Sequence, residues 1–157
     1  MLREWYADCE SILKPRGATI DKFIGDGVFA YWPRADSRTH ALAAEAAQLL
    51  SRTDSSKSLT RRWLKENLGI EVRCHVGLHV GEVALGAMGR GVTTAVGEAV
   101  NVTFRIEGLT RKLETPVLVS AEFVGGWDEA TNVFENAGVH ELKGQPDPVE
   151  VWKLVGE

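Results

Sequence analysis

The sequence predicts an α+β domain of two layers, in which a mixed or antiparallel sheet is covered by helices on one face. Three observations predict this class. Apolar residues recur at helical spacing at the N-terminus and over residues 99–112, two strand-like runs flank Gly25-Asp26-Gly27, and a second pair of strand-like runs ends the chain. Helices therefore interleave with hairpins, and hairpins outnumber crossover connections.

Breaker and capping residues set the limits of the elements. Pro15 and Gly17 end the first helix, and Asp26-Gly27 between apolar β-prone runs predicts a tight hairpin. Asp36 and Ser37 are candidate N-caps for the alanine-rich helix that follows. In chain order we expect a helix over 1–13, a hairpin over 18–32, a helix over 39–52, a loop over 53–58, a short helix over 61–67, two strands over 70–78 and 82–88 turned at Val80-Gly81, a helix over 99–112, a strand over 116–120, and paired strands over 132–141 and 148–155.

This order fits the ferredoxin-like βαββαβ plan, with one difference. The plan begins with a strand, whereas this chain begins with a helix that is already under way at residue 1. The prediction is therefore a ferredoxin-like two-layer sandwich that lacks the usual first strand.

Length and composition describe an ordinary globular protein. The chain has 157 residues, 44% hydrophobic and 25% charged, so we expect one domain spanning 1–157 with a sizeable core. The net charge of −4 provides no general attraction to nucleic acid or to anionic membranes. No apolar run reaches the roughly 18 residues that span a bilayer, and the charged N-terminus does not resemble a signal peptide. Cys9 and Cys74 are expected as reduced core thiols of a cytoplasmic protein rather than as a disulfide or a zinc site.

The hairpin turn is the first candidate site. Asp26 at its tip offers an exposed carboxylate of the kind that Mg²⁺ binds together with substrate phosphates, although a tight turn favours aspartate for its own sake. Lys22, four residues earlier, shares the strand face of Asp26; a solvated strand lysine is the alternative interpretation.

Three further groups are candidates. Asn101 and Arg105 lie four residues apart, so one helix face presents an amide and a guanidinium that suit a sugar oxygen and a phosphate; a cap and a surface arginine are the alternative. Lys143, beside Gly144, is placed to reach a phosphate or to sit solvated in a turn. His79 invites assignment as a metal ligand or general base, but we interpret it as a structural histidine bonded to backbone.

Taken together and in order, these segments resemble the catalytic domain of the class III adenylate/guanylate cyclases. The resemblance rests on Lys-Phe-Ile-Gly-Asp-Gly from Lys22, Val-Gly-Leu-His-Val-Gly-Glu-Val from Val76, Val-Gly-Glu-Ala-Val-Asn-Val-x-x-Arg-x-Glu from Val96, Pro-Val-Leu-Val-Ser from Pro116, and Leu-Lys-Gly from Leu142. It covers essentially the whole chain.

The resemblance implies conversion of a nucleoside triphosphate to the 3′,5′-cyclic monophosphate and pyrophosphate, at sites formed between two protomers of a homodimer. It implies Mg²⁺ or Mn²⁺ as cofactor and a possible upstream regulatory domain. The implied roles are metal binding by Asp26, base reading by Lys22 and Thr94, ribose orientation by Asn101, transition-state stabilisation by Arg105, and phosphate binding by Lys143. Lys22 and Asp26 would serve different active sites.

The residues at the base-reading positions favour ATP. A lysine donates only, which suits N1 of adenine, and a threonine hydroxyl can accept from the N6 amino group. Guanine carries a donor at N1, and guanylate-type members of the family have an acidic residue and a cysteine at these positions. One mispaired buried donor is worth roughly 1–3 kcal/mol, or about 5- to 150-fold.

The chain departs from the family pattern at its start. Family members open with a central strand that carries a second metal-binding aspartate, and no such segment precedes the first helix here. A shortened sequence, a strand supplied by a partner, and a catalytically silent module for dimerisation or nucleotide sensing are the alternatives. We expect this chain alone to be weakly active or inactive, with two neighbouring strands left unpaired. A relative of diguanylate cyclases is excluded because no Gly-Gly-[Asp/Glu]-Glu-Phe run is present.

Overall fold

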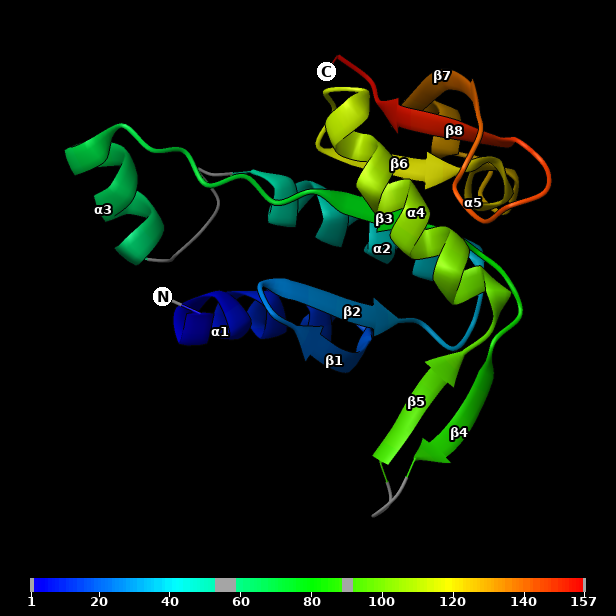
Figure 1. Ribbon diagram of the computed structural model, residues 1–157, viewed down its shortest axis with the longest axis horizontal. Helices are drawn as coiled ribbons and strands as arrows, with labels where there is room; N and C mark the ends of the chain where they lie inside the picture. The colour runs from blue at the N-terminus through cyan, green and yellow to red at the C-terminus, as the bar shows by residue number, and fades with distance from the viewer. Residues whose placement is uncertain (1, 53–58, 89–91, 157) are drawn as a thin grey trace.

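The structure is a computed structural model that describes residues 2–52, 59–88 and 92–156, and these residues form three separate β-sheets (Figure 1). The mixed α+β class predicted above is confirmed; the loop expected over 53–58 lies outside the described residues. The elements are α1 (Leu2–Leu13), η1 (Lys14–Arg16), β1 (Thr19–Ile24), β2 (Gly27–Tyr31), α2 (Ser37–Ser51), α3 (Leu59–Leu68), β3 (Val76–Leu78), β4 (Ala84–Met88), β5 (Val92–Val96), α4 (Glu98–Lys112), β6 (Val117–Ser120), α5 (Ala121–Gly125), η2 (Ala130–Asn132), β7 (Phe134–His140) and β8 (Val149–Leu154).

α1, α2, α3 and α4 form where apolar spacing and caps predicted helices, whereas α5 was not predicted. α1 buries Cys9 and Leu13 against α2. The helical segment continues as η1 and ends at Gly17, which adopts a φ of 83°. α2 begins with a capping box in which the Asp36 carboxylate accepts from the Thr39 amide at 2.8 Å. Asp36 is therefore the N-cap, and Ser37 is already the first helical residue.

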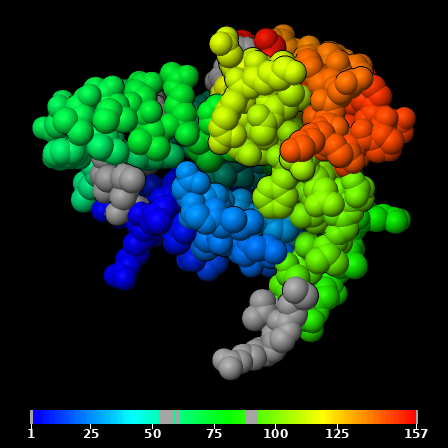
Figure 2. Space-filling model, in the orientation of Figure 1, coloured from blue at the N-terminus to red at the C-terminus, as the bar shows by residue number. Residues whose placement is uncertain are grey.

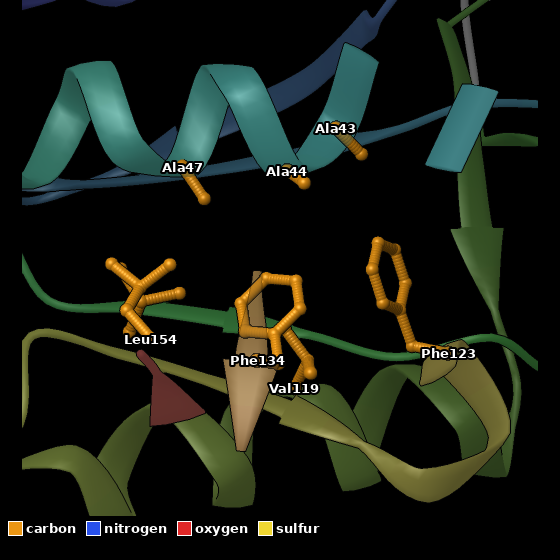
Figure 3. Close-up of a cluster of buried hydrophobic side chains, with 8 residues drawn as sticks. Ala43, Ala44, Ala47, Val119, Phe123, Phe134 and Leu154 are labelled. Atoms are coloured by element: carbon orange, nitrogen blue, oxygen red, sulfur yellow. The ribbon is translucent and has the colours of Figure 1, made fainter. Parts of the chain in front are cut away.

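The core lies between α2 and a four-stranded sheet of order β3-β6-β8-β7. Small alanine side chains let α2 approach the sheet closely, so that larger side chains from the sheet and α5 fill the space between them. Figure 3 shows Ala43, Ala44 and Ala47 facing Val119, Phe123, Phe134 and Leu154.

β6 is buried on both faces, whereas the sequence analysis expected helices on only one face of the sheet. Val117 and Val119 pack toward α2, whereas Leu118 packs toward Val102 and Ile106 of α4. Helices therefore cover both faces of this sheet rather than one (Figure 1). The continuous apolar run Val117–Val119 is the pattern of a strand that is buried on both sides.

The region between residues 70 and 96 differs from the prediction. The strand expected over 70–78 is limited to β3, and the turn expected at Val80-Gly81 does not pair it with β4. β4 instead pairs antiparallel with β5, a strand that the sequence analysis did not identify. β3 runs parallel to β6, because its partner is selected by burial between α2 and α4 rather than by proximity in sequence.

Two strand edges face each other across a pocket of about 340 Å³. Among the described residues, β2 pairs only with β1, and β3 pairs on one side only, with β6. Val28, Ala30 and Val76 line this pocket from the two strands, and Phe104 lines it from α4. The facing edges of β2 and β3 thus have no strand partner in the described part of the chain, which is the unpaired state expected from the resemblance.

None of the helices in the described ranges combines the length and hydropathy needed to cross a membrane.

The close packing of β3 against α4 yields a first prediction. A Cβ at Gly77 would lie 2.6 Å from the backbone nitrogen of Glu107, so Gly77→Ala should lower the free energy of unfolding by about 1–3 kcal/mol or more. Gly108→Ala is the matched control, because nothing lies within 4 Å of its Cβ and alanine favours a helix by about 0.8–1 kcal/mol. Urea unfolding of both variants checks this; equal stability of the two would contradict the packing.

Candidate functional site

The structure brings together Lys22 and Thr94, two predicted site residues that are far apart in the sequence. Lys22 lies on β1 and Thr94 on β5, and the Lys22 Nζ donates to the Thr94 Oγ1 at 3.1 Å. Thr94 is only 7% exposed, while the Lys22 side chain is 47% exposed. The pair therefore presents a partly exposed cationic donor beside a buried hydroxyl.

Asp21 completes this cluster, and the sequence analysis missed it. Its side chain is 1% exposed and accepts from the Thr94 hydroxyl at 2.8 Å and from the Ala95 amide at 2.6 Å. The Lys22 ammonium lies 3.5 Å from the same carboxylate. Because an isolated buried carboxylate is costly, these three partners explain how Asp21 can be buried.

A β-bulge places Asp21 in this position. The β1–β2 register shifts between Ile20 and Lys22, because Ile20 pairs with Ala30 and Lys22 with the adjacent Phe29. Asp21 is thus left without a pairing partner on β2, and the usual alternation of side chains is interrupted. Strict alternation would have placed Asp21 and Lys22 on opposite faces, so no periodicity in the sequence signals the cluster.

Asn101 and Arg105 lie one turn apart on α4 and are both exposed, as their spacing predicted. The neighbouring Val102 and Ile106 are buried beneath them. Phe104 packs against Phe29 of β2 with ring centroids 5.4 Å apart. The polar face of α4 is therefore held in a fixed orientation by the core below it.

Lys143 is exposed in the turn before β8, and its loop is attached to α4. The preceding Leu142 is 6% exposed and packs in the same cluster as Val102 and Ile106. Gln145, two residues after Lys143, donates to the Glu98 carboxylate in the first turn of α4. This anchorage places Lys143 and the Asn101–Arg105 face on the same helix–loop unit.

Asp26 lies at the hairpin tip, apart from the Lys22–Thr94 pair. The indole nitrogen of Trp5 donates to the Asp26 carbonyl at 2.7 Å, and the Tyr6 hydroxyl donates to the Gly25 carbonyl. These two bonds from α1 hold the backbone of the turn, and the Asp26 residue is exposed. Within the described ranges, no group of three or more His, Cys, Asp or Glu side chains could hold a metal ion, and Asp26 itself is an exposed residue with one carboxylate.

His79 has a structural position, but its partner is a side chain rather than backbone. Its Nδ1 lies 2.8 Å from the Ser120 hydroxyl, which also accepts from the Phe123 amide at the start of α5. Burial lowers the pKa of His79 below its ordinary value, and the Glu122 carboxylate 3.9 Å away only partly offsets this.

Cys9 and Cys74 are free thiols, as predicted. Burial raises the pKa of Cys9 to about 12 and that of Cys74 to about 11, so both remain protonated at neutral pH and neither is a reactive nucleophile.

Comparison with known proteins identifies relatives of one kind. No family model matches the chain. The chain is 31% identical to adenylate cyclase 1 of Rhizobium meliloti (strain 1021) over 99% of its own length, and it spans 24% of that relative. The structure matches a bacterial light-regulated adenylyl cyclase with a TM-score of 0.75 at 25% identity, covering 98% of this chain and 43% of the other. It also matches the guanylyl cyclase Cya2 with a TM-score of 0.75 at 24% identity, over 99% and 78% of the two chains.

The depressed pKa of His79 predicts how stability depends on pH. The unfolded chain protonates this histidine near its ordinary pKa of roughly 6.5, whereas the folded chain does so only at lower pH. The contribution of His79 to stability should therefore fall as the pH drops through that range. Urea unfolding of the parent and of His79→Gln should show a larger stability difference at pH 8 than at pH 5.5. An equal difference at both values would show that burial does not perturb His79.

Proposed function

We propose that this chain, a homologue of the class III adenylate and guanylate cyclase domains, converts ATP to 3′,5′-cyclic AMP and pyrophosphate for intracellular signalling. The chain would act as a single catalytic domain over residues 1–157, in the cytoplasm, where free thiols stay reduced. The observation that carries the proposal is the contact of 3.1 Å between Lys22 and Thr94, residues 72 positions apart that the resemblance assigns to the same base.

The chemistry of this pair favours adenine. The Lys22 ammonium can donate to N1 of adenine, and the Thr94 oxygen can accept from the N6 amino group. In guanine, the N1–H donor would face the ammonium donor of Lys22, and the O6 acceptor would face the oxygen of the Thr94 hydroxyl, so neither contact forms a hydrogen bond. Relatives of both adenylate and guanylate type share this fold, so the base choice rests on these two residues.

The α4 face would bind the ribose and the triphosphate. Asn101 would orient the ribose so that its 3′ oxygen attacks the α-phosphorus in line as the bond to the pyrophosphate leaving group breaks. Arg105 would stabilise the negative charge that develops on the phosphoryl oxygens, and Lys143 would bind the phosphates. The exposure of all three side chains, and the attachment of the Lys143 loop to α4, support these roles.

A divalent cation, Mg²⁺ or Mn²⁺, is the proposed cofactor and would neutralise phosphate charge when bound. Asp26 fits one ligand position, because Mg²⁺ often takes one or two carboxylates and completes its shell with substrate oxygens and water. The described residues form no group of three or more His, Cys, Asp or Glu side chains that could hold the ion without the nucleotide. The metal would therefore depend on the nucleotide for much of its binding.

A homodimer is the proposed active form. The β4–β5 hairpin extends away from the rest of the molecule as an arm (Figures 1 and 2). Leu85 and Val96 on this arm are 50% and 47% exposed, and Ile24 at the end of β1 is 51% exposed. Exposed apolar side chains on a projecting hairpin and on the neighbouring β1 favour burial against a partner, which supports a site shared between two protomers.

A silent homology module for dimerisation or nucleotide sensing is the second candidate. The absence of a group of three or more metal-ligating side chains from the described residues favours it, because a module that has lost catalysis has no need of a complete metal site. Nucleotide binding alone does not exclude this alternative, whereas turnover does.

The proposed role of Arg105 is tested by binding. Arg105→Ala should weaken ATP binding in the presence of Mn²⁺ by about tenfold or more, since a charge-assisted hydrogen bond contributes roughly 1.5–3 kcal/mol. Arg111→Ala is the matched control: it removes an exposed arginine of the same helix, one that pairs with Glu107 at 2.9 Å. Titration calorimetry should separate the two variants; equally weak binding by Arg105→Ala and the parent would favour the silent module.

The incomplete metal site of the described residues also predicts the activity of the purified chain. Cyclic AMP should form slowly or not at all with Mg²⁺ or Mn²⁺, because no group of three or more metal-ligating side chains in the described ranges holds the ion. Chromatographic detection of cyclic AMP over hours checks this expectation. Rapid, metal-dependent turnover by the chain alone would disprove it and would also exclude the silent module.

A further inference from the structure

We propose that Asp21 contributes to base specificity, because it fixes the Thr94 hydroxyl as a hydrogen-bond acceptor toward the purine. This inference rests on the proposed function, since it assumes that Lys22 and Thr94 contact the base. Asp21 itself is a positioning residue: its side chain is 1% exposed and acts through Thr94 and Lys22.

The first step is the direction of the hydrogen bond at Thr94. A carboxylate has no proton to give, so the hydroxyl must donate to Asp21 Oδ1 across the 2.8 Å contact. A hydroxyl has one proton and two acceptor lone pairs. One lone pair accepts from Lys22 Nζ at 3.1 Å, which leaves the other as the only function that Thr94 can offer a ligand.

The second step is the rigidity of the carboxylate. Asp21 Oδ2 accepts from the Ala95 backbone amide at 2.6 Å, so each carboxylate oxygen has its own partner and the group cannot rotate without breaking a buried bond. The bulge between Ile20 and Lys22 directs Asp21 to this place, between the two hairpins. The hydroxyl rotor is therefore fixed before any ligand arrives.

The third step is the pattern that the ligand meets. The cluster presents a donor from Lys22 and an acceptor from Thr94, which complements N1 and N6 of adenine. A freely rotating hydroxyl would serve the N6 donor of adenine and the O6 acceptor of guanine equally well. Asp21 removes that second option, so the part of the selectivity for adenine that depends on Thr94 follows from a residue that touches no base.

Asp21→Asn tests the idea without a change of shape. The asparagine side chain has only one oxygen, and this oxygen must accept from the Ala95 backbone N–H. The NH₂ group of the asparagine must therefore face Thr94 and donate to the hydroxyl oxygen. The hydroxyl proton is then released toward the ligand, where it suits O6 of guanine. The ratio of ATP to GTP affinity should fall about tenfold. Asp128→Asn, an exposed change between α5 and η2, should leave the ratio as in the parent.

The measurement uses the full 157-residue chain with the α,β-methylene analogues of ATP and GTP, titrated to millimolar concentration and followed by ¹H–¹⁵N spectra. Asp21→Asn should change the ratio in the parent background but by less than about twofold in a Thr94→Val background, because the effect passes through the hydroxyl. Thr94→Val alone should weaken the ATP analogue and leave the GTP analogue unchanged or tighter. The measurement on Thr94→Val tests the inference even if Asp21→Asn fails to fold.

The possible outcomes separate the inference from the proposed function. A parent that prefers the ATP analogue, with a reduced preference in Asp21→Asn only when Thr94 is present, supports the inference. Equal weakening of both analogues in Asp21→Asn or in Thr94→Val overturns it and leaves the nucleotide site in place. A parent that binds neither analogue overturns the inference together with the proposed function.

Discussion

The buried carboxylate of Asp21 is the interaction on which the candidate site depends. It joins β1 to β5, elements of two hairpins that share no backbone ladder, through bonds to Thr94 and to the Ala95 amide. A charge at 1% exposure is stable only when its oxygens are all satisfied, so the network positions Lys22 and Thr94 as a unit. Asn101 and Arg105 lie on α4, whose polar face is fixed because Leu118, Val102 and Ile106 pack beneath it.

The parts of the fold that were predicted correctly are those with local signals. Helical spacing and the Asp36 cap located α1, α2 and α4, and Asp26-Gly27 located the first hairpin. The errors lie where partners are distant in sequence. Apolar alternation over 70–78 predicted a full strand, but only Val76–Leu78 have a strand partner, the parallel β6. β5 was not predicted because a five-residue strand beside glycines has little local signal. α5 was not predicted either, because it is only five residues long.

The same division holds for the site. Five site residues were predicted from the sequence because each lies within or beside a motif, and their roles remain proposals. They are Lys22, Thr94, Asn101, Arg105 and Lys143. No sequence pattern indicated Asp21, because a bulge reverses the alternation on which strand reasoning relies and the Ala95 partner is 74 residues away. Polar residues whose partners are set by tertiary structure cannot be found from periodicity alone.

The most direct test of the central claim is a structure of this chain with a non-cyclisable ATP analogue and Mn²⁺. The account predicts that N1 of adenine lies within hydrogen-bond distance of Lys22 Nζ and N6 near Thr94 Oγ1, with the triphosphate against Arg105 and Lys143 of the same protomer and beside Asp26 of a second protomer. An adenine bound elsewhere, such as in the pocket between β2 and β3, or a nucleotide bound entirely within one protomer, would contradict it.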